Sequence, residues 1–268
     1  MKRLLKNSWF FLMIIMVFPA CSGLKYLPAG EKLYTGSEVI LVPTNKLDKK
    51  ENKFIQNIEK TAIRPNPNQV IFGMRPKLWM YVKAGENPTG KIKKWLKDKG
   101  EAPVLLSSIK PAVTADLIDA KIFNIGIFNG YTESKIVEKG LTGKIIYTSY
   151  IHDRYKIKKV TYAVSDDSIS LLIQKEKNNS IIKKGEDYNL GTLKNERIRI
   201  DAILKNKGYF YFDPDFLLFK ADTSKINHSV TLQLTLKDSV PQDALTAYRI
   251  NKVTIDQGEQ TEMSIRSS

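Results

Sequence analysis

The sequence predicts an α+β protein that contains small tandem domains with the element order β-α-α-β-β. Two internal similarities lead to this prediction. The ten residues from Asp119 to Phe128 align with those from Asp201 to Phe210, at an offset of 82 positions, and Tyr155–Tyr162 aligns with Tyr248–Ile255, at an offset of 93. Such offsets exceed the roughly 20–50 residues of a solenoid repeat, so the repeated unit is a small domain.

The composition excludes several classes of protein. The 268 residues are 42% hydrophobic and 10% aromatic, which is typical of a globular chain and argues against intrinsic disorder. One cysteine and two histidines exclude an internal disulfide framework and a structural His/Cys zinc site. The net charge of +15 raises the possibility of a polyanionic partner, but its meaning depends on the compartment.

The first residues have the pattern of a signal peptide that spans 1–20. Three positive charges precede the unbroken apolar run Trp9–Phe18, which as a helix reaches only about 15 Å and is too short to span a bilayer. Cys21, the only cysteine, follows this run after Pro19 and Ala20, an arrangement that resembles a bacterial lipobox and implies lipidation of Cys21. The alternative is an ordinary signal peptide that is cleaved after Gly23.

Export changes the expected partners and location. Outside the cytoplasm nucleic acid is an improbable partner, and an anionic membrane surface or an acidic protein is more plausible. No acidic cluster follows Cys21 in Ser22–Lys25, which by resemblance to lipoprotein sorting signals favours a lipid anchor in the outer membrane that faces the periplasm. We expect no cofactor other than the covalent lipid.

The copy of the repeat between residues 154 and 240 shows the predicted elements most clearly. Tyr155–Val164 alternates apolar with polar residues, as a half-buried strand does, and Ser168–Gln174 suits a first helix capped by Asp166 or Asp167. Leu190–Lys207 carries an apolar stripe and is followed by Gly208, a residue that favours a helix end.

The remaining elements of this copy are two strands. Tyr209–Phe219 is rich in aromatic residues and is broken by Pro214, and residues 230–236 alternate strictly between apolar and polar. A three-stranded sheet of this length is stable when one face packs on helices, which gives the order β-α-α-β-β.

This order, with a helix that runs into Gly-Tyr-Phe before the second strand, resembles POTRA domains, which precede the membrane barrel of BamA- and TamA-like outer-membrane assembly proteins. The N-terminal half is most similar to the lipidated TamA-like proteins of Bacteroidetes. The segments that carry this narrower resemblance are Cys21–Pro28, Gly30–Gly36, Gly73–Tyr81 and Gly100–Leu106.

The resemblance implies a series of units along the chain. After a lipidated N-terminus and linker (21–30), we expect POTRA-like units at 31–101, 102–153 and 154–240, and an incomplete fourth unit at 241–268. Asp48–Glu51 suits the start of a helix in the first unit. Because no barrel-like sequence follows, we also expect that the chain is truncated.

The implied function is non-enzymatic: a periplasmic arm that binds unfolded outer-membrane protein segments by strand addition and docks a TamB-like inner-membrane-linked protein. The second strand of each unit would be the open edge. The candidate edge residues are Tyr209, Phe210, Tyr211, Phe212, Ile127 and Phe128, and Gly126 and Gly208 are the candidate repeat-defining turns. The alternative function is a self-standing outer-membrane lipoprotein that acts as a scaffold or surface-binding module.

Two further motifs have competing interpretations. Gly85–Lys91 approaches a phosphate-binding loop after a strand-like Leu78–Val82, but Ile92 replaces the magnesium-binding hydroxyl, so we expect a turn with Thr89 as helix cap. Lys91–Lys99 predicts an amphipathic helix, either solvated over a small core or in contact with anionic lipid or an acidic partner. No residue pattern predicts a catalytic or metal site.

Overall fold

The computed structural model describes residues 23–162 and 168–253 and divides the chain into two compact units. Unit 1 ends at Tyr155 and unit 2 begins at Lys156. Each unit contains one three-stranded mixed sheet, and the fold class is α+β, as the sequence predicts.

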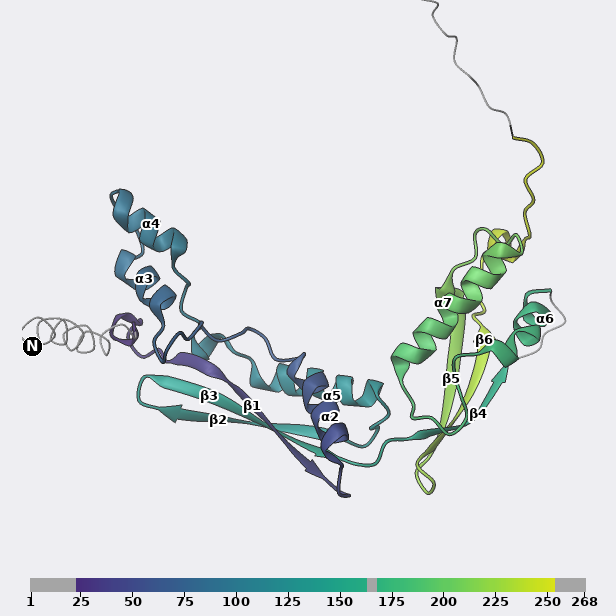
Figure 1. Ribbon diagram of the computed structural model, residues 1–268, viewed down its shortest axis with the longest axis horizontal. Coiled ribbons are helices and arrows are strands. Elements are labelled where there is room, and N and C mark those ends of the chain that lie inside the picture. Colours follow the sequence, from purple (N-terminus) through teal and green to yellow (C-terminus); the bar gives the residue numbers. More distant parts are fainter. Residues whose placement is uncertain (1–22, 163–167, 254–268) are drawn as a thin grey trace, which may run out of the picture. The chain divides into compact units, whose positions relative to one another are not determined.

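The sheet of unit 1 joins strands that are far apart in the sequence. Its strands β1 (Leu33–Pro43), β2 (Tyr131–Lys139) and β3 (Thr142–Ile151) lie in the order β1-β3-β2. The central strand β3 pairs parallel with β1 and antiparallel with β2 (Figure 1). Both outer strands are therefore sheet edges.

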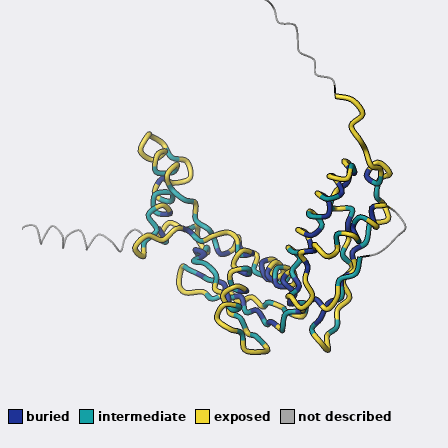
Figure 2. The backbone as a smooth tube through the Cα atoms, turned by 45° about the vertical axis from the view of Figure 1, so that its right-hand side comes forward, coloured by how far each residue is buried: buried dark blue, intermediate teal, exposed yellow. Residues whose placement is uncertain are grey.

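One face of this sheet is covered by the helices α2 (Lys49–Lys60) and α5 (Pro111–Asn124). The predicted start of α2 is confirmed, since the side chain of Asp48 accepts a hydrogen bond of 2.7 Å from the backbone N–H of Glu51. Alternate residues of β3 are buried and meet these helices (Figure 2), in a core that includes Tyr34, Ile55, Ile118, Ile122, Ile145 and Tyr147.

Between α2 and α5 the chain forms two further helices, α3 (Pro76–Ala84) and α4 (Lys91–Lys99), which pack on each other. Unit 1 is thus a β-α-α-β-β unit with a helical hairpin inserted between its two sheet-covering helices. The strand-like interpretation of Leu78–Val82 is wrong, because these residues lie in α3.

The structure therefore differs from the division into units at 31–101 and 102–153. Hydrogen bonds between β1 and β3 bring residues 33–43 and 142–151 into one sheet, so these segments belong to one body. The short second unit had no first strand of its own because that strand is β1, which precedes the insertion.

Unit 2 has the same order without the inserted hairpin. It consists of β4 (Lys156–Tyr162), α6 (Ser168–Lys175), α7 (Leu190–Asn206), β5 (Leu217–Ser224) and β6 (Ser229–Leu236), with the sheet order β4-β6-β5. The predicted helices and the strand at 230–236 are confirmed. Asp166 and Asp167 lie outside the described residues.

The predicted strand over Tyr209–Phe219 is wrong in its first part. Residues 209–213 are a turn with irregular flanks and Pro214–Phe216 form a short 3-10 helix, so that β5 begins only at Leu217. The proline lacks the N–H that a strand ladder needs, and its fixed φ suits the start of a helical turn. The other 3-10 helices are Leu24–Tyr26, Leu106–Ser108, Lys177–Asn179 and Gln242–Leu245.

The segment expected to open a fourth unit is described as far as residue 253. Residues 248–253 form neither helix nor strand, and Ile250 and Val253 are 85% and 72% exposed. Cys21 and the predicted signal peptide, 1–20, lie outside the described residues.

Candidate functional site

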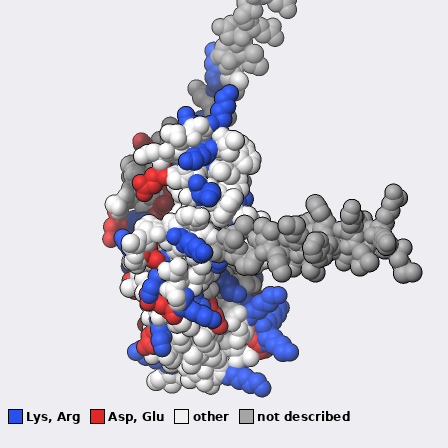
Figure 3. Space-filling view, turned by 90° about the vertical axis from the view of Figure 1, so that its left-hand side faces the viewer, with Lys and Arg blue, Asp and Glu red and all other residues white. Residues whose placement is uncertain are grey.

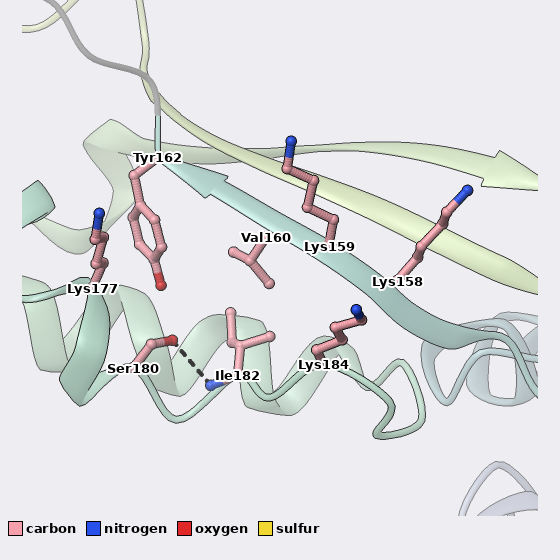
Figure 4. A pocket seen from close by; sticks show the side chains of 8 residues that line it. All are labelled: Lys158, Lys159, Val160, Tyr162, Lys177, Ser180, Ile182 and Lys184. Atoms are coloured by element: carbon pink, nitrogen blue, oxygen red, sulfur yellow. Dashed lines mark hydrogen bonds between the residues drawn. The ribbon is translucent and has the colours of Figure 1, made fainter.

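A groove of about 590 Å³ runs along the outer edge of β4 in unit 2. One side is the strand, with Val160 and Tyr162 directed at the opposite side, which is the chain from Lys177 to Lys184 (Figure 4). Four exposed lysines form its rim: Lys158, Lys159, Lys177 and Lys184. The floor is apolar, since Val160 is half-buried and Ile182 is buried.

The far wall of the groove is held in place by a buried carboxylate on α7. Glu196 is fully buried, and its two oxygens accept hydrogen bonds of 2.9 and 2.8 Å from the guanidinium of Arg199. The backbone N–H of Ile181 donates to the same carboxylate over 3.1 Å. Because Ile181 lies within the wall, this bond fixes the wall against α7.

Glu196 stays ionised in this environment. Burial alone would raise the pKa of the Glu196 carboxyl, but the hydrogen bonds from Arg199 and Ile181 outweigh burial and hold that pKa below its usual range. The hydroxyl of Tyr162 also donates to Glu196, over 3.4 Å, which connects the end of β4 to the network. The wall and the strand therefore share one anchoring group.

The backbone edge of β4 is paired at its start and open further along. The N–H of Ile157 donates to Glu186 and its carbonyl accepts from Gly185, at 2.8 and 2.7 Å. Within the described residues, no backbone bond joins the outer edge of β4 from Lys158 to Tyr162 to another segment, since β6 is its only neighbour in the sheet. The backbone groups of this stretch are therefore open along the edge of the sheet that borders the groove.

This arrangement is suited to an extended peptide. Open backbone N–H and C=O groups at a sheet edge pair with an incoming strand largely regardless of its sequence. Lysines around the rim favour acidic side chains on that strand, and Val160 and Ile182 offer apolar contact to alternate residues. The geometry thus offers binding and orientation of such a peptide.

The strand-addition residues predicted from sequence lie elsewhere. Ile127 and Phe128 precede β2, and Tyr209–Phe212 precede β5, so none of the six is in a strand. Ile127, Tyr209 and Phe212 are core residues, whereas Phe210 and Tyr211 are 68% and 57% exposed. β2 and β5 are edge strands as expected, but the predicted residues are not on them.

The two candidate turn glycines do occupy equivalent places. Gly126 follows the end of α5 with φ of +93°, and Gly208 follows the end of α7 with φ of +99°. L-residues with a side chain rarely adopt these values, and a Cβ on Gly208 would lie 2.6 Å from the carbonyl oxygen of Tyr248. Glycine is required at this position for both reasons.

Both glycines bind a tyrosine by the same contact. The N–H of Tyr155 donates to the carbonyl of Gly126 over 2.9 Å, and that of Tyr248 donates to the carbonyl of Gly208 over 2.7 Å. Each tyrosine ring then packs on an aromatic ring just after the glycine, Phe128 at 4.8 Å and Tyr211 at 5.3 Å. The two glycines are the residues related by the offset of 82, and the two tyrosines are those related by the offset of 93. The two sequence similarities thus belong to the two partners of one repeated contact.

The phosphate-binding loop is excluded by its setting. Such a loop joins a strand to a helix, but residues 85–90 join helix α3 to helix α4. Gly90, and not Thr89, is the N-cap residue of α4. Among the described residues no group of three or more His, Cys, Asp or Glu could hold a metal ion, and no helix is long and apolar enough to cross a membrane.

The groove has no continuous sequence motif, because its two sides, 158–162 and 177–184, are separate segments of the chain. The only local signal is Lys158-Lys159, which interrupts the alternation of the predicted strand. In the structure this dipeptide coincides with a register shift between Ile157 and Lys159 against β6. Such a β-bulge often redirects side chains beside a binding site.

A scan against protein-family models found no match, and a search of curated protein sequences found none either. Solved structures do resemble the chain. POTRA domains 1–3 of Omp85 from Anabaena match 74% of this chain and 60% of their own, with 15% identity and a TM-score of 0.38. POTRA domains 3–5 of BamA from Haemophilus influenzae match 79% of this chain and 68% of their own, with 8% identity and a TM-score of 0.42.

A two-domain structure, POTRA 1–2 of the Anabaena Omp85, matches 76% of this chain and 94% of its own, with 14% identity and a TM-score of 0.35. The chain thus spans 60% of the first of these structures. Because identities and TM-scores are this low, we rest the proposed function on the topology of each unit and on the groove. Over about three quarters of its length the chain is similar to POTRA domains of Omp85 and BamA proteins.

Proposed function

We propose that the chain is a non-enzymatic periplasmic POTRA arm of an outer-membrane assembly factor, which binds extended segments of unfolded outer-membrane proteins by strand addition. The observation that carries this proposal is the groove along β4, where an open sheet edge borders an apolar floor and a lysine rim. The β-α-α-β-β order of both units, with the sheet order first-third-second, supports the POTRA assignment.

The proposal includes a location. Cys21 carries a covalent lipid in the outer membrane, so that the two units face the periplasm. The lipobox-like sequence before Cys21 supports this anchor, and the positive net charge suits acidic partners in that compartment. A TamB-like inner-membrane-linked protein is the docking partner that the sequence resemblance suggests. Mass spectrometry of the mature N-terminus tests the anchor, and an unmodified terminus beyond Cys21 would refute it.

Strand addition can be tested with two peptides that have the same side chains and differ in their backbone N–H groups. A fluorescent 12-residue peptide of alternating Val and Glu should bind, because its backbone pairs with β4 and its carboxylates reach the lysine rim. Replacing alternate peptide N–H groups by N-methyl should abolish binding, since methylation removes the donors that pair with the strand. Equal affinity for the methylated peptide would contradict strand addition.

The position of the site is tested with charge reversal. The double variant Lys177→Glu and Lys184→Glu should weaken binding by about five- to thirtyfold, since two lost surface pairs contribute about 0.5–1 kcal/mol each. The matched control is Lys194→Glu with Lys207→Glu, two exposed lysines on and just after α7 that do not line the groove. If the control variant loses the same affinity, the charge of the unit as a whole is responsible and the groove is not the site.

A further inference from the structure

The inserted hairpin of unit 1 has no counterpart in unit 2. Residues 61–110 join the two sheet-covering helices of unit 1, whereas residues 176–189 join those of unit 2. The two units otherwise share their element order and sheet topology, so α3 and α4 are not needed to complete the fold. A need to complete the core of unit 1 therefore does not explain why the hairpin is present.

The surface of α4 combines exposed apolar residues with lysines. None of its nine residues is buried, and Ile92 and Trp95, one turn apart, are 77% and 56% exposed. The exposed lysines of α4 are Lys91, Lys93, Lys94 and Lys99, and its only acidic residue is Asp98. Figure 3, which faces the side where α3 and α4 project in Figure 1, shows more basic than acidic side chains.

One lysine shows how α4 is attached to α3. The ammonium of Lys97 lies 4.0 Å from the centre of the Tyr81 ring and donates to the carbonyl of Gly85 over 2.8 Å. Gly100, directly after α4, approaches α3 so closely that a Cβ there would lie 2.6 Å from the backbone nitrogen of Tyr81. The side of α4 near Lys97 is thus fixed to α3, and Ile92 and Trp95 remain uncovered.

The N-terminal segment of the mature chain packs on the same hairpin. Gly23 is buried against α3, where a Cβ would lie 3.2 Å from Cγ of Leu78. The ammonium of Lys83, also on α3, lies 5.9 Å from the centre of the Tyr26 ring. Only two peptide steps separate Gly23 from Cys21, a span of at most about 7 Å.

We propose that α4 lies on the membrane surface, with Ile92 and Trp95 in the interface and its exposed lysines on anionic phospholipid headgroups. The inference rests on the proposed lipid anchor, because a lipid on Cys21 would hold α3 and α4 next to the bilayer. Tryptophan favours the interface of a bilayer, and lysines reach past apolar residues to the headgroups. A single lipid anchor gains from such a second membrane contact.

Charge and exposure favour a membrane over an acidic protein as the occupant. A protein interface of ordinary size needs a broad complementary surface, whereas this helix offers a narrow strip of two large apolar side chains flanked by lysines, as interfacial amphipathic helices do. The strip also lies beside the expected point of membrane attachment. This arrangement orients unit 1 on the membrane.

The test uses the fluorescence of Trp95 in the mature chain. Trp79→Phe leaves Trp95 as its only tryptophan, since Trp9 lies in the predicted signal peptide. The protein is reconstituted in vesicles of phosphatidylethanolamine and phosphatidylglycerol, with or without brominated acyl chains. We expect a blue shift and quenching by the brominated lipid, and about a tenfold weaker effect in Lys91→Glu with Lys99→Glu, the two exposed lysines beside Ile92 and Trp95 on the helix surface. The control Lys220→Glu with Lys225→Glu, in unit 2, should quench like the parent.

The possible outcomes distinguish a failure of this inference from a failure of the proposed lipid anchor. Mass spectrometry of the same sample reports the lipid on Cys21. A lipidated chain that floats with the vesicles while Trp95 remains unquenched overturns the inference and leaves the anchor intact. A chain without lipid whose Trp95 is still quenched refutes the anchor and keeps the membrane contact, and a chain with neither refutes both. If Trp79→Phe is poorly folded, the loss of quenching in Trp95→Phe, with Trp79 retained, gives the same decision.

Discussion

Glu59, on α2, is a carboxyl group buried in the core of unit 1, and replacing it by glutamine should stabilise the protein at neutral and alkaline pH. Its side chain is fully buried, and neither oxygen has a hydrogen bond of ordinary geometry. Burial raises the pKa of Glu59 from 4.5 to about 7, while the nearby Ser149 hydroxyl opposes the rise and the charge of Asp119 adds to it. Glutamine keeps the shape and removes the charge.

The size of the effect follows from this pKa. A carboxyl with a pKa of 4.5 when unfolded and about 7 when folded binds more protons in the folded state between these pH values. The unfolding free energy therefore falls by about 3 kcal/mol as pH rises from about 4.5 to about 7; below this window Glu59 costs nothing, and above it the full loss persists without further change. Glu59→Gln should match the parent near pH 4 and exceed it by up to about 3 kcal/mol at pH 8.

Urea titrations from pH 4 to pH 8 measure this difference. In a chain that begins at residue 22 the tryptophans are Trp79 and Trp95, both in unit 1, so tryptophan fluorescence follows the unit that contains Glu59. The control is Glu86→Gln, which also removes one carboxyl group but from the exposed turn between α3 and α4. A difference between Glu59→Gln and the parent that is constant from pH 4 to pH 8 would refute the buried-charge account.

Two other substitutions test unit 2. Arg199→Ala leaves the fully buried Glu196 without its cation and should lower the unfolding free energy by about 3–5 kcal/mol, as measured by urea titration with far-ultraviolet circular dichroism. Gly208→Ala should destabilise the protein by more than Gly185→Ala, since both glycines have positive φ but only at Gly208 would the Cβ meet a backbone atom, the oxygen of Tyr248. Equal losses of unfolding free energy in the two variants would show that the close approach of Tyr248 to Gly208 does not affect stability.

Local sequence signals located most of the helices and two strands, β4 and β6, correctly. Asp48 marks the start of α2, the apolar stripe before Gly208 marks α7, and the alternation at 230–236 marks β6. In each case the decisive contacts lie within a turn or two of chain: a cap, a glycine with positive φ, or one buried sheet face.

The errors come from contacts between distant segments. Parallel pairing of β1 with β3 brings together residues about a hundred positions apart, and nothing local to Leu33–Pro43 indicates its partner. The inserted hairpin separates β1 from β3 in the sequence. The predicted boundary between units 31–101 and 102–153 therefore falls inside unit 1. The aromatic run before Pro214 has high strand propensity, but the turn after Gly208 buries Tyr209 and Phe212 in the core instead.

The candidate site was invisible in the sequence for the same reason. The groove needs the strand end at Tyr162, the wall at Ser180–Lys184 and the carboxylate of Glu196 to meet in space. Each of these residues has an ordinary local role, and only the buried Glu196–Arg199 pair shows why the wall stands where it does.

The most direct test of the account is amide hydrogen exchange at the outer edge of β4, measured by NMR on the mature chain with an excess of the alternating Val–Glu peptide. The account predicts that amides between Lys158 and Tyr162 exchange more slowly when the peptide is bound, and that the N-methylated peptide gives no protection. Protection confined to β5, or none at β4 at a peptide concentration that saturates binding, would contradict strand addition at this groove.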